Sequence, residues 1–303
     1  SSGDNIEMLL KESAVAYYYA LTLQEELQVP IGIITASRGA SAAEEWIRGE
    51  SYKNLPDSIK TLYKPEPPKY PSSWYNGMIN PILPYKIKGV IWYQGEGNRN
   101  KASQYQRLFP ALINSWRAKF MQEAMPFYFV QIAPFEIIKT NTAFVREAQL
   151  RAMQTVINTG MAVTMDIGEQ YNIHPSQKEQ VGNRLAYWAL AKDYQVQGIA
   201  FSGPVYKQLQ KANNGKLNVM FDHCDGGLTS FGKPLTGFEI AGEDKVFYPA
   251  EVLINSNRAG SITVWSDSVK NPISVRYGFK SWVEGSLYNT QGLPASSFRT
   301  DEW

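Results

Sequence analysis

Segments with the pattern of buried β-strands alternate with amphipathic helical segments over the first two thirds of this chain of 303 residues. The strand segments are short and rich in β-branched and aromatic residues, whereas the helical segments repeat apolar residues every three or four positions. A strand followed by a helix occurs four times. The pattern predicts an α/β fold with a mostly parallel sheet, whose ligand crevice lies at the carboxyl ends of the strands.

The expected elements can be placed by residue number. Strands are expected at residues 29–37, 87–94, 126–133 and 160–166, and long helices at residues 6–27, 103–120, 145–157 and 176–194. Ser41 and Glu44 have the spacing of a capping box, which predicts a short helix after the first strand. Residues 65–84 are dense in proline, tyrosine and tryptophan and predict an irregular loop.

Beyond residue 196 the pattern changes. Short β-type segments are separated by Gly, Asn and Asp; they lie at residues 217–223, 237–242, 250–254, 261–267 and 273–279. They predict an antiparallel β module. We therefore expect two domains, residues 1–196 with the parallel sheet and residues 197–303 with the β module, whose C-terminal tail packs back on the first domain.

Composition excludes several functions. The formal net charge is +2 and no block of Lys or Arg occurs, so neither nucleic acid nor an anionic membrane surface is expected as a partner. No segment approaches the roughly 20 apolar residues of a membrane span. The single cysteine, Cys224, rules out an internal disulfide and supports no zinc cluster. Aromatic residues make up 13% of the chain, which fits either a protein that stacks sugars on rings or a large core.

The chain has two histidines, and His174 is the candidate base. A neutral imidazole is well suited to take a proton from a hydroxyl and return it. His174 precedes Pro175, which suits the first turn of the helix expected after residues 160–166 and places the ring at the rim of the crevice. A lone histidine is more often structural. His223 stands beside Cys224, but two ligands make no metal site, so a structural role is favoured there.

The turn after residues 87–94 is the second candidate. It brings together Gln94, Gly95, Glu96 and Asn98. The amide side chains carry N–H donors, and glycine permits the backbone angles that aim an N–H at a common point, so the turn can present donors to an oxyanion. The alternative is an ordinary strand-to-helix turn, in which Glu96 or Asn98 caps the next helix.

Ser41 is the candidate nucleophile inside this sequence. Residues 39–43 resemble the Gly-x-Ser-x-Gly elbow of some hydrolases, but Ala43 stands where the last glycine is needed for the tight turn. The capping box already gives Ser41 a role. We therefore expect Ser41 to be a cap rather than a nucleophile.

These stretches together resemble the sialate O-acetylesterase family, a branch of the SGNH hydrolases that also includes acetyl-xylan-type esterases. The most specific parts are Trp92–Glu96 and Ile173–Pro175. The matching segments are residues 12–47, 76–98, 105–117, 145–154, 166–186, 237–252 and 286–303. The resemblance implies a flavodoxin-like SGNH hydrolase fold, a three-layer α/β sandwich with a parallel sheet, with the C-terminal antiparallel β module attached to it.

In that family a serine in a Gly-Gln-Ser-Asn turn works with the histidine of a His-Pro motif, which His174 matches. The resemblance makes Gly39 an oxyanion donor and matches Gln94, Gly95 and Glu96 to a Gln-Gly-Glu turn. The reaction that the resemblance implies needs no metal and no cofactor.

Two positions depart from the family pattern. Members usually read Trp-Gly-Gly-Thr where this chain has Arg38-Gly39-Ala40-Ser41, so the turn at Gly39 is expected to have a different shape. Many members have an aspartate where this chain has Asn172. His174 would then work in a dyad or be oriented by another acceptor, such as Asp166 or a backbone carbonyl.

The nucleophile is missing, because no Gly-Gln-Ser-Asn occurs in these residues. In the family this turn comes before the helix expected at residues 6–27. We therefore expect a segment preceding Ser1 to complete the sheet and supply the serine, because omitting an interior strand would leave backbone groups unpaired. The sugar itself would meet Trp92, Tyr93 or Trp74 by stacking.

The resulting expectation is a serine esterase that removes O-acetyl groups from a sugar, most closely sialic acid. Arg146 is a candidate partner for the sugar carboxylate, although a structural ion pair is the commoner use of such an arginine. An acetyl-xylan-type esterase and an inactive carbohydrate-binding homologue are the alternatives. The first residues do not form a signal peptide, but sugar deacetylation favours a periplasmic, secreted or lysosome-like address.

Overall fold

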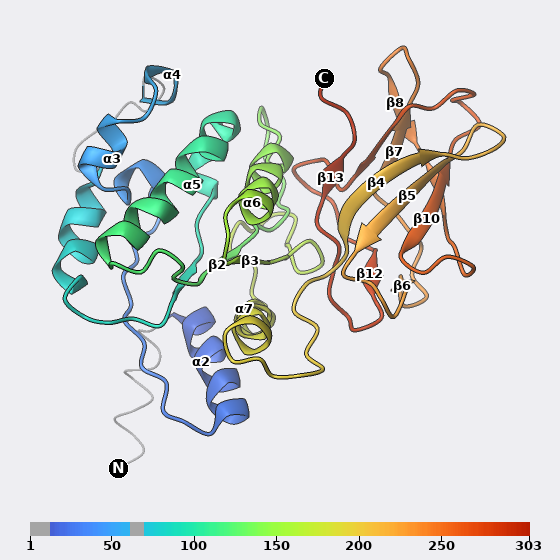
Figure 1. Cartoon of the computed structure of the whole chain (residues 1–303). Helices are drawn as coiled ribbons and strands as arrows, with labels where there is room; N and C mark the ends of the chain where they lie inside the picture. Colours follow the sequence, from blue (N-terminus) through green and yellow to red (C-terminus); the bar gives the residue numbers. More distant parts are fainter. Residues whose placement is uncertain (1–12, 61–69) are drawn as a thin grey trace. The chain divides into compact units, whose positions relative to one another are not determined.

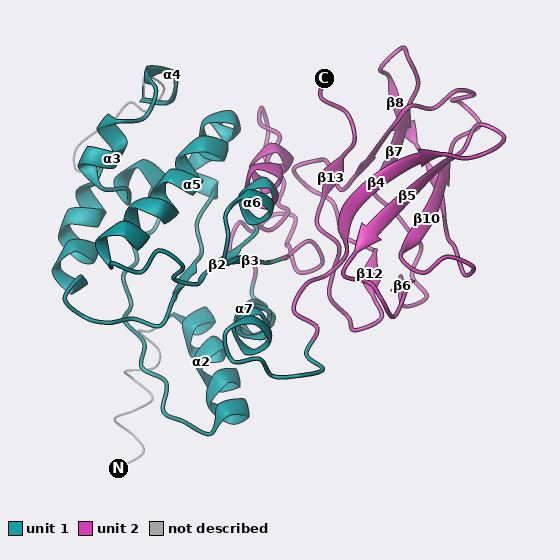
Figure 2. Ribbon diagram, in the orientation of Figure 1, with its two compact units in different colours: residues 1–131, 151–162, 176–199 teal, residues 132–150, 163–175, 200–303 magenta. Residues whose placement is uncertain are grey.

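The computed structural model describes residues 13–60 and 70–303. The chain divides into two compact units, one made of residues 1–131, 151–162 and 176–199 and the other of residues 132–150, 163–175 and 200–303 (Figure 2). The first unit holds the parallel sheet and the second holds the antiparallel sheets (Figure 1). A domain boundary between residues 196 and 197 stays a prediction.

The parallel sheet has three strands in the order β1-β2-β3. They are β1 (Val90–Trp92), β2 (Phe127–Val130) and β3 (Thr159–Ala162). Both pairs are parallel, with Ile91 opposite Tyr128 and Tyr128 opposite Gly160. Every residue of β2 is buried, as expected for a strand covered on both faces. The predicted α/β fold with a parallel sheet is confirmed.

Helices cover both faces of this sheet. Phe129 packs edge to face against Phe109 of α5 (Ala102–Lys119), with ring centroids 4.9 Å apart. On the opposite face Tyr128 stacks on Trp188 of α7 (Lys178–Lys192) at 6.3 Å. Alternate residues of one strand therefore pack into different helix layers, which gives the expected three-layer arrangement.

The first described helix, α2 (Ala14–Leu27), packs on α7. Ser13 caps it, because the Ser13 hydroxyl accepts a hydrogen bond from the backbone N–H of Ala16. Gly182 permits the close approach, since a Cβ there would lie 2.6 Å from the Cβ of Tyr18. The helix predicted at residues 6–27 is confirmed over Ala14–Leu27, and residues 6–12 lie outside the described part of the chain. The remaining helices are α3 (Gly49–Lys53), α4 (Asp57–Lys60) and α6 (Ala143–Thr155).

The strand predicted at residues 29–37 is wrong, because this segment forms no strand. Its apolar side chains are exposed: Val29 is 47%, Ile33 45% and Ile34 51% accessible. A strand needs a neighbour to share its backbone hydrogen bonds, and no strand of the described residues pairs with this segment. A strand followed by a helix therefore occurs three times rather than four.

The irregular loop predicted at residues 65–84 is only partly correct. Residues 65–69 lie outside the described ranges. Tyr75–Ile79 form a π-helical turn and Asn80–Ile82 a 3₁₀ turn. Tyr75 and Ile79 are both 2% exposed. Their spacing is that of buried apolar residues on one face of a helix, which favours a helical turn despite the nearby prolines.

The antiparallel β module is confirmed in the second unit, where all five predicted segments contain strands. The strands are β4 (Val205–Lys211), β5 (Leu217–Asp222), β6 (Leu228–Thr229), β7 (Phe238–Ala241), β8 (Phe247–Pro249), β9 (Glu251–Ile254), β10 (Ser261–Trp265), β11 (Ser274–Tyr277), β12 (Tyr288–Asn289) and β13 (Phe298–Arg299). They form sheets with the orders β4-β5-β10-β9, β13-β11-β7-β8 and β12-β6. Inward residues of the two larger sheets share one apolar core, which includes Val219, Ile240 and Tyr277. No helix in the described part of the chain is long and apolar enough to span a membrane.

Candidate active site

The turn that follows β1 packs tightly against residues 41–46 of the same unit. Glu96–Asn98 form a 3₁₀ turn there. A Cβ on Gly97 would lie 2.4 Å from the carbonyl oxygen of Ser41, far inside any real contact. Glycine is therefore required at position 97, because it alone lets the two backbones approach this closely.

Asn98 joins the two segments through a buried hydrogen-bond network and is 1% exposed. Its Nδ2 donates to Oε2 of Glu44 at 2.8 Å. Its Oδ1 accepts from the backbone N–H of Ala43 at 2.9 Å and from Nε2 of Gln94 at 2.8 Å. Asn98 is held by long-range bonds to Ala43 and Glu44 and in turn anchors the side chain of Gln94, so it does not serve as the cap of the following helix.

Gln94 is 9% exposed and has both amide hydrogens engaged in this network. Its Nε2 donates to Asn98 and also to the carbonyl oxygen of Ser41 at 3.1 Å. Because both partners are acceptors, the nitrogen rather than the oxygen of the Gln94 amide must face them. An oxyanion that uses this amide must replace one of the two bonds.

Two buried carboxylates, Glu44 and Glu45, stand in the 3₁₀ turn Ala43–Glu45. Glu45 accepts from the backbone N–H of Ala42 at 2.9 Å and from the indole N–H of Trp74 at 2.7 Å. The predicted capping box at Ser41 and Glu44 is therefore wrong by one residue. Glu44 is instead committed to Asn98, a partner 54 residues away that local spacing cannot reveal.

The hydroxyl of Ser41 is held at both ends. It donates to the carbonyl oxygen of Arg38 at 2.8 Å and accepts from the indole N–H of Trp46 at 2.9 Å. Ser41 is 6% exposed. Because its proton is committed to a carbonyl and the residue is buried, the geometry gives Ser41 a structural use other than the predicted cap.

Gly39 lies on an exposed turn, and a Cβ placed on it would meet nothing within 4 Å, so its backbone is open to a ligand. The next residue, Ala40, has a φ of 54°. This left-handed backbone suits glycine and strains alanine. The turn therefore keeps a glycine-like shape even though alanine occupies the position.

The three candidate stacking residues differ in access. Trp92 is 7% exposed and belongs to the aromatic core, with ring centroids 5.9 Å from Trp46 and 5.8 Å from Trp116. Trp74 is half-buried and carries the guanidinium of Arg38 5.3 Å above its ring. Trp92 is too deeply buried to serve as a sugar platform, and Arg38 covers one face of Trp74.

Tyr93 is half-buried, and the ammonium of Lys178 lies 5.2 Å from its ring centroid. Burial raises the pKa of the Tyr93 hydroxyl, and the nearby Glu96 raises it further. The phenol therefore stays protonated at neutral pH and can act as a hydrogen-bond donor.

His174 belongs to the second unit and lies in an exposed loop. The predicted place in the first turn of a helix is wrong, because α7 begins at Lys178. The Asn172 side chain shapes the loop: its Oδ1 accepts from the backbone N–H of His174 at 2.9 Å, and its Nδ2 donates to Oε2 of Glu169 at 2.9 Å. Asn172 thus orients the backbone at His174 rather than the imidazole.

The two other charged candidates of this unit are less accessible. Asp166 is half-buried four residues after β3. Arg146 is 0% exposed, and its guanidinium donates to the carbonyl oxygens of Gly278 and Lys280 and to the hydroxyl of Ser297. Burial lowers the pKa of Arg146 to about 9, so the group stays charged at pH 7. Its observed use is to hold the 278–280 loop, and a sugar carboxylate has no approach to it.

His223 has a φ of 60° and packs its ring against Phe201 at 5.5 Å. Its backbone carbonyl accepts from the side chain of Asn289. Burial raises the pKa of the adjacent Cys224 thiol to about 11. In the described ranges, residues 13–60 and 70–303, no three His, Cys, Asp or Glu residues stand close enough to hold a metal ion.

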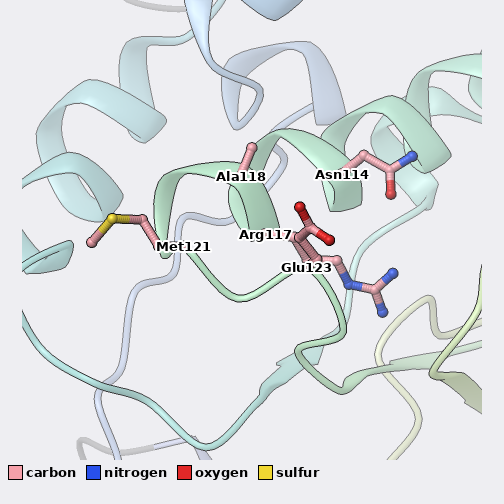
Figure 3. Close-up of a pocket in the computed structure, with 5 residues that line it drawn as sticks. All are labelled: Asn114, Arg117, Ala118, Met121 and Glu123. Carbon is pink, nitrogen blue, oxygen red and sulfur yellow. The ribbon is translucent and has the colours of Figure 1, made fainter.

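A surface hollow at the end of α5 contains none of these residues (Figure 3). It is lined by Asn114, Arg117, Ala118, Met121 and Glu123. Arg117 is already bonded to the carbonyl oxygens of Met125, Ile157 and Asn158. The hollow therefore adds no catalytic group to the candidate site.

Comparisons with known proteins agree with one another. Residues 11–191 match the family described as "Carbohydrate esterase, sialic acid-specific acetylesterase". The sialate O-acetylesterases of Homo sapiens and Pongo abelii are each 32% identical over 235 residues, which is 69% of this chain and 45% of those proteins. A crystal structure described as a novel carbohydrate acetylesterase from Xanthomonas citri has a TM-score of 0.84 and 36% identity, and the match covers 95% of this chain and 65% of that one. The chain thus spans less than half the length of the curated relatives.

Replacing Ala40 with glycine should stabilise the protein. The left-handed backbone costs alanine about 1–2 kcal/mol, and the greater freedom of glycine in the unfolded chain takes back about 0.4–1 kcal/mol. We expect Ala40→Gly to raise the free energy of unfolding by roughly 0.5–1 kcal/mol in urea denaturation. Ala259→Gly, at an exposed position outside the left-handed region, should lower it. Equal losses in both variants would contradict the backbone geometry at Ala40.

Removing the Asn98 side chain should destabilise the first unit. Asn98→Ala leaves the buried Glu44 carboxylate without its amide donor and frees Gln94, and we expect a loss of about 3 kcal/mol in the free energy of unfolding. Asn54→Ala, at the exposed end of α3, is the matched control and should stay within about 0.5 kcal/mol. Tryptophan fluorescence in a urea titration measures both. A loss at Asn98 no larger than the control would show that the network is not closed as described.

Proposed function

Because this chain belongs to the sialic acid-specific acetylesterase family of carbohydrate esterases, we propose that it acts as a serine esterase that removes O-acetyl groups from a sugar, with sialic acid the favoured one. The observation that carries the proposal is that the family match, residues 11–191, includes the turn at Gly39, the network of Gln94 and the loop of His174. The likeness of 95% of the chain to a carbohydrate acetylesterase structure supports it.

The proposed reaction has two steps. A serine hydroxyl attacks the carbonyl carbon of the acetyl ester while His174 takes its proton, and the tetrahedral intermediate expels the sugar oxygen, which receives that proton from His174. His174 next takes a proton from water, the resulting hydroxide attacks the acyl-serine, and acetate leaves as the serine oxygen is reprotonated. His174 thus alternates between base and acid.

The negative charge of both intermediates would fall on the former carbonyl oxygen. We assign the backbone N–H of Gly39 and the amide of Gln94 as its donors. Of the two bonds made by Gln94, the one to the Ser41 carbonyl is longer, 3.1 Å against 2.8 Å, and is the one to exchange for the substrate oxygen. The other keeps the amide anchored on Asn98.

Supporting roles follow from the positions of the neighbours. Asn98 braces Gln94, whereas Gly95 and Glu96 shape the turn between them. Tyr93 has a protonated hydroxyl with which to meet the sugar. Asn172 is occupied with the backbone at His174, so Asp166 or a backbone carbonyl is left to orient the imidazole, unless His174 works in a dyad with the serine.

We further propose that the serine comes from polypeptide outside these 303 residues. Two observations support this. The Gly-Gln-Ser-Asn turn does not occur in the sequence. No strand of the described residues pairs with residues 29–37, and Val29, Ile33 and Ile34 of this β-branched segment are exposed, as expected for an interior strand whose neighbour is supplied from elsewhere. An extracytoplasmic address belongs to the same proposal.

The test is the activity of the His174→Ala variant, made in the protein as its source cell produces it. Because His174 is exposed, we expect the fold to survive and kcat/KM for an O-acetylated sialic acid to fall at least about 10³-fold. His223→Asn is the matched control; asparagine tolerates the left-handed backbone there, and activity should persist. Full activity of the His174→Ala variant would contradict the proposed mechanism. Absence of hydrolysis by the wild-type protein would favour a sugar-binding homologue.

A further inference from the structure

Two loops of the second unit expose large apolar side chains, and one of these loops carries His174. Tyr171 is 87% accessible and lies three residues before His174, and Ile138 is 83% accessible. Neither side chain packs in a core, so neither contributes much to stability. Because such exposed apolar side chains occur on two neighbouring loops, their exposure needs an explanation other than folding.

The two loops, residues 135–142 and 166–174, are joined by direct hydrogen bonds. The backbone N–H of Glu136 donates to the carbonyl oxygen of Gln170 at 2.7 Å, and Nε2 of Gln170 donates back to the Glu136 carboxylate. Gly168 also lies so close to Pro134, the residue before the first loop, that a Cβ would meet the Pro134 carbonyl oxygen at 2.4 Å. Ile138 lies two residues beyond Glu136 and Tyr171 one residue beyond Gln170, so both stand close to the link that joins the two loops.

Further bonds fix the ends of both loops. Ser281 clamps the first: its carbonyl accepts from the N–H of Phe135 and its hydroxyl donates to the carbonyl of Thr140 at 2.7 Å. In the second, the bonds of Asn172 to Glu169 and to the N–H of His174 close the turn that carries Tyr171. The exposed side chains thus stand on a backbone that is already ordered, which lowers the entropy lost when a ligand binds.

We propose that Tyr171 and Ile138 form a platform on which the sugar ring carrying the acetyl group rests while His174 acts on it, an inference that rests on the proposed function. An aromatic ring with a free face binds the C–H face of a pyranose, and Tyr171 has such a face, whereas Trp92 is in the core and Trp74 is covered by Arg38. Ile138 extends the apolar surface.

Charge on the two loops points to the ring rather than to a carboxylate as the feature recognised. They carry three acidic residues and one lysine. These are Glu136, Asp166, Glu169 and Lys139. Since such a surface gives no net attraction to an anion, the platform recognises the sugar ring and not its carboxylate.

The test compares a sugar substrate with an ester that has no sugar. We expect Tyr171→Ala to raise KM for an O-acetylated sialic acid about three- to tenfold and to leave hydrolysis of 4-nitrophenyl acetate unchanged, because only the first substrate needs the platform. An acetylated neutral sugar should show the same rise. Tyr171→Phe should stay near wild type. Tyr85→Ala, which removes an aromatic ring that is 66% exposed in the first unit, is the matched control and should change neither substrate.

Two results would overturn the platform. An unchanged KM for the sugar in Tyr171→Ala would show that the ring is not contacted, and equal losses for both esters would show that Tyr171 only supports the His174 loop. Both leave the proposed function standing, because the wild-type protein still hydrolyses the ester and His174→Ala still does not. If the wild-type protein hydrolyses neither ester, the proposed function fails and the platform fails with it.

Discussion

The burial of the Glu44 carboxylate determines where Gln94 lies in the candidate site. Glu44 is 0% exposed, and a buried carboxyl group is costly unless it is hydrogen-bonded. Asn98 supplies its amide N–H, which turns the Asn98 oxygen toward Ala43 and Gln94. The amide of Gln94 is thereby placed before any substrate arrives. The position of a proposed oxyanion donor thus follows from the need to satisfy a buried acid.

The aromatic core beneath this network fixes where Glu44 stands. Trp46, two residues after it, packs edge to face on Trp92 at the end of β1, and its carbonyl accepts from the indole N–H of Trp116 on α5. Segments 41–46 and 94–98 are consequently attached to the same strand and helix. The indole N–H of Trp46 donates to Ser41 and that of Trp116 donates to the Trp46 carbonyl, so these two rings give the anchor both contact area and a fixed direction. The sheet, its α5 layer and the polar turn therefore form one continuous packing unit.

Much of the fold was accessible from local patterns, because strands β1 to β3, the long helices and the β module each carry their own periodicity. The failures lie where structure depends on partners far along the chain. Residues 29–37 have the composition of a strand but lack a neighbour in the described residues, and composition cannot reveal pairing. Ser41 and Glu44 have the spacing of a capping box, but the box forms one residue later in the chain. The reason is that the Ser41 hydroxyl accepts from the indole N–H of Trp46 and the Glu44 carboxylate accepts from the amide of Asn98.

The sequence predicts the residue types of the candidate site but not the hydrogen bonds between them. Gln94, Asn98 and His174 were identified from a turn and a motif, but the engagement of both Gln94 hydrogens required coordinates. The sequence pattern favours Trp92, Tyr93 and Trp74 as stacking residues and indicates no role for Tyr171, whereas the structure places Trp92 in the core and Trp74 under Arg38. The closeness of Tyr171 to His174 in sequence was the available signal.

The proposed mechanism requires that His174 serve a serine outside these 303 residues. Labelling the protein from its source with a fluorophosphonate, followed by peptide mapping by mass spectrometry, identifies the reactive serine directly. The account predicts a single labelled peptide with the sequence Gly-Gln-Ser-Asn from outside this sequence, and no labelling in His174→Ala. A label on Ser41, or on any other serine of these residues, would contradict it.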